Sequence, residues 1–368
     1  MNSSTGILTI DLGAIQSNWQ YIVSSLANGA ECAAVVKANA YGVGAMEVAQ
    51  ALSDAGCKTF YLATLEEASE LRNLLSTNTA LYVLGGVKVG YESTFVDLNL
   101  IPVLYSADAI NQWLNFCGSI NKALPCAIKV DTGMTRFGLS GSDFDGLLAL
   151  LSKSPFLNPV LLMSHLACAD ECEHPLNKIQ LDKFKQIITK AKKYFPDIKT
   201  SLANSSGTFL GEEYHFDMVR VGAGLYGINP QPSKPNPMKQ TINLKLPILQ
   251  IRTIESAVDV GYGAAASAKV GQRLAVAAGG YADGINRTLG LQPKGMVDNH
   301  NVNAIGRISM DSCIFDISAC SNTNPEYIEV INRELSIDKI SVENKSLGYE
   351  VLTSLGRRYK RQYLSADK

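Results

Sequence analysis

Short apolar runs alternate with longer amphipathic segments through about the first 230 residues of the chain. Short apolar runs predict buried strands, and segments whose apolar positions recur every three or four residues predict helices. Strands are predicted at residues 7–11, 32–36, 59–63, 81–84, 101–104, 126–130, 160–165, 199–203 and 218–221. Helices are predicted at residues 15–26, 45–55, 65–75 and 176–194. The alternation favours a (β/α)8 barrel, with a doubly wound open sheet as the alternative.

The character of the sequence changes at residues 229–238, which contain four prolines. Clustered prolines disfavour regular structure, so this segment is predicted to be a linker. Beyond it, short runs typical of strands are separated by Gly, Asp and Asn turns. These runs lie at residues 246–255, 273–278, 295–305 and 311–317, and a helical run follows at residues 350–355.

The chain is therefore predicted to form two domains, an α/β domain at residues 10–230 and a mainly β domain at residues 241–368. With 368 residues it is long enough to bury a large core in each. The nine strands predicted in the first part exceed the eight places of a barrel, so the run at residues 7–11 is expected to lie elsewhere.

Composition excludes several classes of protein. Lys and Arg total 33 against 34 Asp and Glu, a formal charge of −1, so no excess of positive charge points to nucleic acid or an anionic membrane. The first residues do not resemble a signal peptide and no apolar run reaches transmembrane length, so a cytoplasmic protein is expected. The eight cysteines show no close-spaced framework, which fits reduced and mostly buried thiols.

A zinc site is conceivable where two cysteines lie close to two histidines, Cys168, Cys172, His165 and His174. It is disfavoured because no second cysteine pair completes it, and no metal is expected.

The first candidate for chemistry is Lys37, which follows the apolar run at residues 32–36 and precedes Gly42 and Gly44. Lysine is rarely buried unless it is paired or functional. At the carboxyl end of a barrel strand it would point into the mouth of the fold, where a Schiff-base lysine could act. For a lone lysine, a solvated strand end is the more common interpretation.

A second candidate lies in the segment Lys-Val-Asp-Thr-Gly-Met-Thr-Arg-Phe-Gly, residues 129–138. It follows another predicted strand, so Arg136 would reach the same mouth and could hold a carboxylate through two hydrogen bonds. A salt bridge from Arg136 to Asp131 is the structural alternative. His165 also ends a strand, and on its own it is more often a core residue than a catalyst.

Two segments in the last third of the predicted barrel could bind an anion. Asn204 and Ser205 open a possible helix, and Gly222 and Ala223 lie in a glycine-rich turn. Barrels commonly bind phosphate at the loops after their last two strands. Taken singly, each segment is an ordinary cap or turn, but together they predict a phosphate site.

These motifs, in this order, resemble those of alanine racemases. The run Ala-Val-Val-Lys-Ala-Asn-Ala-Tyr-Gly-Val-Gly, residues 34–44, is similar to the family's segment that attaches pyridoxal phosphate (PLP), with Val43 where the family often has His. The other matching segments are residues 129–138, 163–167, 204–207, 220–224, 260–264, 279–284 and 306–311. The resemblance covers nearly the whole chain. It implies an N-terminal (β/α)8 TIM-type barrel and a C-terminal mainly β domain that also takes residues 1–10.

The resemblance implies an isomerase that interconverts L- and D-alanine with PLP and supplies D-alanine for peptidoglycan. Lys37 would hold the cofactor and act as a base on one face of the substrate. Tyr262 of the partner subunit would act on the other face, so the working unit would be a homodimer with shared active sites.

The resemblance also implies the other site residues. Around the cofactor they would be Tyr41, His165, Asn204, Ser205, Arg220, Gly222 and Ala223. Around the substrate they would be Arg136 and, from the partner chain, Tyr281, Met310 and Asp311. Arg220 would face the pyridine nitrogen and disfavour its protonation, because like charges repel. Lys129 is a candidate for carbamylation, and Tyr359 for a contact with the phosphate.

Three alternatives remain open at this point. A racemase of another small amino acid, such as serine, would differ only in a few pocket contacts. A PLP-dependent decarboxylase of the same architecture would be expected to carry an acidic residue in place of Arg220. A non-catalytic PLP-binding barrel would lack a β domain, and residues 241–368 argue against it. Whether the enzyme is biosynthetic or catabolic is not decided by the sequence.

Overall fold

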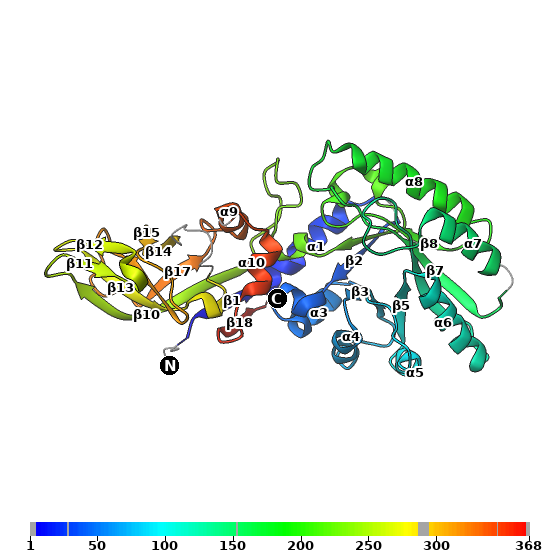
Figure 1. Ribbon diagram of the computed structural model, residues 1–368, viewed down its shortest axis with the longest axis horizontal. Helices are drawn as coiled ribbons and strands as arrows, with labels where there is room; N and C mark the ends of the chain where they lie inside the picture. The colour runs from blue at the N-terminus through cyan, green and yellow to red at the C-terminus, as the bar shows by residue number, and fades with distance from the viewer. Residues whose placement is uncertain (1–4, 28, 152–153, 286–293, 344, 366–368) are drawn as a thin grey trace. The chain divides into compact units, whose positions relative to one another are not determined.

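The computed structural model describes residues 5–27, 29–151, 154–285, 294–343 and 345–365, which form two compact units (Figure 1). One unit comprises Ile15–Leu225 and Asn229–Met238 and is called the barrel unit below. The other is built from the described residues of Met1–Ala14, Tyr226–Ile228 and Lys239–Lys368 and is called the β unit.

The barrel unit is organised around eight parallel strands of the described chain, in the spatial order β8-β7-β6-β5-β4-β3-β2-β9. These are β2 (Glu31–Val35), β3 (Thr59–Leu62), β4 (Ala80–Val83), β5 (Leu100–Leu104), β6 (Leu124–Lys129), β7 (Leu157–Met163), β8 (Lys199–Ser201) and β9 (Met218–Val221). The backbone N–H groups of Asp217 and Arg220 donate to the carbonyls of Thr200 and Ala203, at 3.1 and 3.0 Å. These bonds join β9 to β8 and close the sheet into a barrel.

Helices cover the outer side of this sheet (Figure 1). They are α3 (Ala45–Asp54), α4 (Leu65–Arg72), α5 (Glu92–Asp97), α6 (Ala107–Ser119), α7 (Gly141–Leu151) and α8 (Pro175–Ala191), and α1 (Leu12–Ser24) follows the first strand of the chain. Polar side chains begin two of them. The Thr64 and Ser106 hydroxyls accept hydrogen bonds from the N–H groups of Glu67 and Ala109, which would otherwise lack partners at a helix start.

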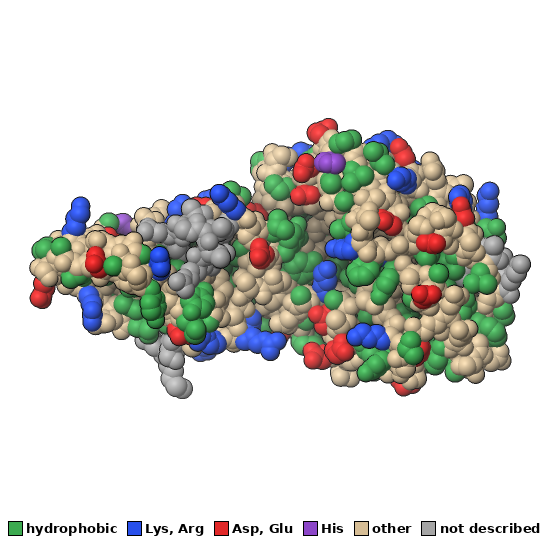
Figure 2. Space-filling model, viewed as in Figure 1, with side chains coloured by type: hydrophobic (Ala, Val, Ile, Leu, Met, Phe, Trp, Pro, Cys, Tyr) green, Lys and Arg blue, Asp and Glu red, His purple; other side chains and the backbone are tan. Residues whose placement is uncertain are grey.

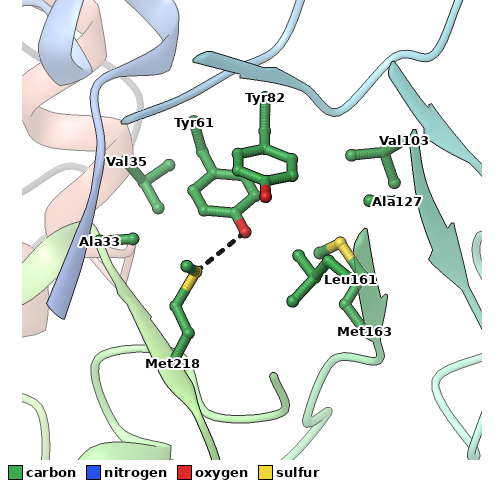
Figure 3. Packing of buried hydrophobic residues seen from close by; sticks show 9 residues of the cluster. All are labelled: Ala33, Val35, Tyr61, Tyr82, Val103, Ala127, Leu161, Met163 and Met218. Carbon is green, nitrogen blue, oxygen red and sulfur yellow. Dashed lines mark hydrogen bonds between the residues drawn. The ribbon is translucent and has the colours of Figure 1, made fainter. Parts of the chain in front are cut away.

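Apolar side chains fill the interior of the barrel. They are Ala33, Val35, Tyr61, Tyr82, Val103, Ala127, Leu161, Met163 and Met218, drawn from seven strands (Figure 3). The rings of Tyr61 and Tyr82 stack with their centroids 4.8 Å apart, and the Tyr61 hydroxyl donates to the Met218 sulfur at 3.2 Å. Burial raises the pKa of Tyr61 well above its ordinary value, so this phenol stays neutral.

The β unit contains a sheet in which six of the described strands pair in a closed ring. The long strand β10 (Ile242–Thr253) pairs through its first half with β17 (Tyr327–Ile331) and through its second half with β13 (Arg273–Ala278). Between them the order continues through β16 (Ser312–Asp316), β15 (His300–Ala304) and β14 (Lys294–Val297). The first strand, β1 (Ile7–Asp11), pairs antiparallel with β10 and parallel with β18 (Lys360–Leu364).

Smaller elements complete the β unit. The hairpin of β11 (Val258–Val260) and β12 (Ala266–Ala268) and the helices α9 (Ile337–Glu343) and α10 (Gly348–Ser354) lie outside the main sheet.

The predicted fold class, a TIM-type barrel plus a mainly β domain, is confirmed, and the open doubly wound sheet is excluded by the joining of β8 to β9. The run at residues 7–11 lies outside the barrel, as expected. The single strand-like run predicted at residues 295–305 is in fact two strands, β14 and β15, which form a hairpin. Asp298 and Asn299 turn the chain between β14 and β15 with φ of 46° and 66°, a conformation that Asp and Asn tolerate better than most residues.

Acidic and basic side chains are interspersed on the face of the molecule shown in Figure 2. This mixture agrees with the near-zero formal charge of the chain. Among the described residues, no helix combines the length and the apolar character that crossing a membrane requires.

Because the rings of Tyr61 and Tyr82 stack, removal of the Tyr82 ring should destabilise the protein more than removal of its hydroxyl alone. Tyr82→Ala removes a buried ring and should lower the free energy of unfolding by about 3–5 kcal/mol. Tyr82→Phe keeps the ring and should cost less than about 1.5 kcal/mol. Urea denaturation of both variants measures the difference, and equal losses would show that the ring stack is not what stabilises the barrel interior.

Candidate functional site

Lys37 lies two residues beyond the carboxyl end of β2, at the start of the turn α2 (Lys37–Tyr41). This turn is left-handed, because Ala38, Asn39, Ala40 and Tyr41 all have φ between 51° and 56°. Residues with a Cβ atom adopt this conformation at a cost of roughly 1–2 kcal/mol each, so four in a row need support from their surroundings. The motif predicted a glycine turn here but gave no sign of its handedness.

Hydrogen bonds close the turn. The N–H of Ala40 donates to the carbonyl of Val36 at 2.9 Å, and the N–H of Gly42 donates to the carbonyl of Ala38 at 2.8 Å. Gly42 has φ of 90° and ends the turn at little steric cost. The Asn39 side chain then accepts from the N–H of Ala45 at 2.8 Å, which supports the start of α3.

The ammonium of Lys37 is in a setting that favours its neutral form. Its pKa is lowered, first by burial and then by the nearby cation of Arg136, while Glu67 opposes the shift. A neutral amine is the form that can attack a carbonyl or accept a proton.

Lys129, the last residue of β6, lies in the same region and is buried. Burial lowers its pKa to about 8, with further contributions from the cations of Arg220, Arg136 and Lys37. Its ammonium lies 5.5 Å from the centroid of the Phe137 ring.

Asp131 does not pair with Arg136 through any ion pair among the described residues. Its carboxylate instead accepts from the N–H groups of Gly133 and Met134, at 2.9 and 3.0 Å, and from that of Thr135. The structural alternative of an Asp131–Arg136 salt bridge is therefore wrong. Asp131 shapes the loop that carries Arg136.

Arg220, in β9, is a buried cation surrounded by neutral acceptors. Its guanidinium donates to the Ser201 hydroxyl and the Ser164 carbonyl, both at 2.5 Å, and to the Leu202 carbonyl at 3.3 Å. One of its nitrogens also lies 3.3 Å from His165 Nδ1. Burial lowers the pKa of Arg220 to about 10, which still leaves it charged at neutral pH.

His165 is held neutral in this environment. Its pKa is well below the ordinary value because of burial first and then because of Arg220, Lys129 and Arg136. Since Arg220 can only donate, the unprotonated Nδ1 of His165 is the atom that accepts from it.

The predicted phosphate-binding residues also meet. The Ser205 hydroxyl accepts from the N–H groups of Gly222 and Gly224, at 3.0 and 3.2 Å, so the two segments are joined. A Cβ on Gly222 would overlap the Tyr41 hydroxyl, which places Tyr41 against the same backbone. Asn204 accepts from the N–H of Gly207 at 2.8 Å, and Ala223 starts the short 3-10 helix η3 (Ala223–Tyr226), where N–H groups lack partners within the helix.

A buried residue that the sequence did not single out connects the loops after β6 and β7. Gln180, on α8, donates to the Thr132 hydroxyl at 3.1 Å and the His165 carbonyl at 2.9 Å, and it accepts from the N–H of Ala167 at 2.9 Å. It is fully buried. The available signal was a Gln on the apolar face of the helix predicted at residues 176–194.

The remaining predicted residues lie in the β unit. Tyr262, in the 3-10 helix η4 (Tyr262–Ala264), is 67% exposed, and Met310 is 52% exposed, which is unusual for such large apolar groups. Tyr281 is also exposed. These side chains are presented to the surroundings of the unit and are not packed in its core.

Two loops of the β unit are joined to each other. The N–H groups of Gly279, Tyr281 and Ala282 donate to the carbonyls of Asp311, Ser309 and Met310, at 3.0 to 3.1 Å. The Arg358 guanidinium binds the buried carboxylate of Asp283 at 2.8 Å and that of Asp311 at 2.7 Å. Asp311 thus supports the loop structure, a role that its motif did not suggest.

Tyr359 is buried in the β unit. A Cβ on Gly6 would lie 2.7 Å from its ring, so the ring packs directly against the backbone there. This packing is that of a core residue and gives no support to a role at a phosphate.

Comparisons with known proteins agree with this arrangement. A model of the alanine racemase N-terminal domain matches residues 10–230, and a model of the alanine racemase C-terminal domain matches residues 241–363. The chain is 43% identical to an alanine racemase of Rhodospirillum rubrum over 98% of this chain and 96% of that protein. It is 39% identical to a catabolic alanine racemase of Agrobacterium fabrum over 98% of this chain and 92% of that protein.

A solved structure is similar over the whole length as well. The crystal structure of alanine racemase from Bartonella henselae with covalently bound pyridoxal phosphate has a TM-score of 0.92 and 36% sequence identity to this chain. The match covers 98% of this chain and 100% of that one.

Because the ammonium of Lys129 is buried, we expect it to lower the free energy of unfolding by an amount that depends on pH. Its pKa of about 8 in the folded protein is below the value of about 10.4 for an exposed lysine, so unfolding takes up a proton between these pH values. The stability contributed by this group therefore rises with pH across that window. In cofactor-free protein, Lys129→Met should increase the free energy of unfolding at pH 7, and the gain should shrink by pH 10.

Urea denaturation at the two pH values measures this effect. The exposed Lys122, changed to Met, is the matched control and should show no such dependence. A gain at Lys129 that is the same at both pH values would contradict the account.

Proposed function

Because this chain belongs to the alanine racemase family, we propose that it interconverts L- and D-alanine using PLP held by Lys37. The observation that carries the proposal is that a half-buried lysine with a lowered pKa, Lys37, and a buried arginine with neutral hydrogen-bond partners among the described residues, Arg220, act on the same two groups, Lys129 and His165. D-alanine made in this way would serve peptidoglycan synthesis, in the cytoplasm. The free cysteines, six of them buried among the described residues, suit a reducing compartment.

The residues of the barrel mouth fit PLP. An aldehyde needs a neutral amine, which the setting of Lys37 favours. A phosphate needs N–H and hydroxyl donors with close backbone approach, and the cluster of Tyr41, Asn204, Ser205, Gly222 and Ala223 would supply them. The Ser205 hydroxyl, which accepts from the N–H of Gly222, can still donate its own hydrogen, and the Tyr41 hydroxyl lies against the backbone of Gly222. When bound, PLP supplies the electron sink that makes the α-proton of an amino acid acidic.

Arg220 would decide which reaction follows. A guanidinium facing the pyridine nitrogen disfavours protonation of that nitrogen, and its neutral acceptors leave the positive charge uncompensated. His165, neutral and beside Arg220, would lie against the ring. A weaker electron sink favours return of the proton to carbon over side reactions, as a racemase requires. A decarboxylase of this architecture is disfavoured because no acidic residue stands in place of Arg220.

Arg136 would hold the carboxylate of the substrate. Its loop is fixed by Asp131, and the surrounding charges of Lys37, Lys129 and Arg220 are positive, which favours an anionic ligand. Lys129, with its pKa near neutrality, is a candidate for carbamylation, since only a neutral amine reacts with CO2. A carbamate there would supply the negative charge that this group of cations lacks.

Two bases on opposite faces would complete the racemase. Lys37 would move the proton on one face, and Tyr262 of the partner subunit would move it on the other. The exposure of Tyr262, Tyr281 and Met310 supports a homodimer in which these side chains meet a second copy of the chain. With Asp311, they would form the substrate side of the partner's site. Serine is the alternative substrate, because one added hydroxyl changes binding only modestly.

The assignment of Lys37 has a direct chemical test. Protein loaded with PLP and treated with borohydride should carry the pyridoxyl group on Lys37, identified by peptide mass spectrometry, and should racemise alanine faster than serine. A pyridoxyl group on Lys129, or on no lysine, would overturn the proposal.

The shared site has a test by subunit mixing. Lys37→Ala and Tyr262→Ala homodimers each lack one base at both sites and should be severely impaired. A mixed dimer would have one intact site and one site with both lesions, so activity should return to about half that of wild type per mixed dimer. If both bases came from one chain, every site would keep a lesion and mixing would restore nothing.

A further inference from the structure

The left-handed turn after Lys37 needs an external contact to hold it, because four consecutive residues with a Cβ atom have positive φ. Glu67 makes that contact. One of its carboxylate oxygens accepts from the N–H of Ala38 at 2.7 Å, and the other accepts from the N–H of Ala63 at 2.8 Å. Ala38 is the first residue of the turn with positive φ.

We propose that Glu67 is a positioning residue for Lys37, which holds the turn left-handed and keeps the lysine amine directed to the site. The proposal rests on the function proposed above only in taking Lys37 as the reactive lysine. No part of it depends on which amino acid is the substrate.

The geometry explains why a carboxylate stands here. Ala38 follows β2 closely, Ala63 follows β3 directly, and these strands are parallel neighbours. The two oxygens of Glu67 therefore join the carboxyl ends of two strands, each taking one N–H. A glutamine could accept only one of these bonds, because its amide nitrogen would face the other N–H donor.

Glu67 is itself fixed in place. It lies in the first turn of α4, where its own N–H donates to the Thr64 hydroxyl at 3.3 Å. Negative charge at a helix start is favoured, and hydrogen bonds from N–H groups to a carboxylate are stronger than those to a neutral acceptor. The helix thus presents the carboxylate to the turn with little freedom to move.

The same carboxylate contributes to the charge around the amine. Arg136 and Lys129 face Lys37 from β6 and the loop after it, neutral His165 faces it from the end of β7, and Glu67 faces it from α4. Burial and Arg136 lower the pKa of Lys37, whereas Glu67 raises it. Removal of the Glu67 charge alone should therefore lower the pKa of Lys37 further.

Glu67→Gln separates positioning from general stability. In cofactor-free protein, hydrogen exchange of the peptide covering residues 36–44 should become about tenfold to a hundredfold faster, the effect of losing one charge-assisted hydrogen bond. The apparent affinity for added PLP should fall by a similar factor. Glu70→Gln, one turn later on the same helix and exposed, is the matched control and should behave as wild type.

The pH profile of PLP uptake separates the positioning role of Glu67 from its charge. If Glu67 positions the turn, Glu67→Gln should expose Lys37 and move the midpoint of uptake to higher pH, toward the ordinary lysine value, because burial is the main cause of the lowered pKa of Lys37. A midpoint at lower pH, with hydrogen exchange of residues 36–44 unchanged, would mean that Glu67 acts only through its charge and would overturn the proposal.

A rescue experiment covers the case in which Glu67→Gln does not fold. Ala38→Gly relieves the steric cost of positive φ, so the double variant Ala38→Gly, Glu67→Gln should recover folding and most of the PLP affinity. A double variant that is no better than the single one assigns Glu67 to the stability of the barrel and overturns the proposal. If wild-type protein takes up PLP elsewhere than on Lys37, the proposed function fails, while hydrogen exchange and rescue of folding still test the link between Glu67 and the turn.

Discussion

An excess of positive charge at one end of the barrel is the constraint on which the rest of the site depends. Lys129 is influenced by the charges of Lys37, Arg136 and Arg220, and Lys37 by that of Arg136. Among the described residues, no carboxylate forms an ion pair with any of these four cations. Burial first, and these neighbouring cations second, lower the pKa values of both lysines and of His165. The ligands that suit such a site are anions.

Such a group of charges is tolerable only because neutral dipoles surround it. The Ser201 hydroxyl and the backbone carbonyls of Ser164 and Leu202, at the ends of β7 and β8, solvate Arg220 in place of water. Gln180 then ties the loops after β6 and β7 together from the outer helix α8. Parallel strands make this possible, since all of their carboxyl ends meet at the same end of the barrel.

The sequence was sufficient for the parts of the fold and site that depend on local pattern. Apolar runs located the eight barrel strands, because each is buried on both sides, and Lys37 and Arg136 stood out as charges at strand ends. The left-handed turn was not predictable, since Ala38 and Ala40 have no preference for positive φ and the carboxylate that accepts from the N–H of Ala38 belongs to Glu67, 29 residues away in the sequence. The structural roles of Gln180 and Arg358 were not predictable for the same reason, because their partners lie on other elements. The hairpin at β14 and β15 was missed because two adjacent apolar runs were merged across a two-residue turn.

The pairing of β1 with β10 and β18 has a consequence for co-translational folding. The barrel strands form one uninterrupted stretch of the chain and can assemble while later residues are still being translated. The first strand has no such option, since its two neighbours are made more than 200 residues later. The strand β1 must therefore wait unpaired until β10 has been translated, and an unpaired strand exposes N–H and C=O groups to chaperones and to aggregation.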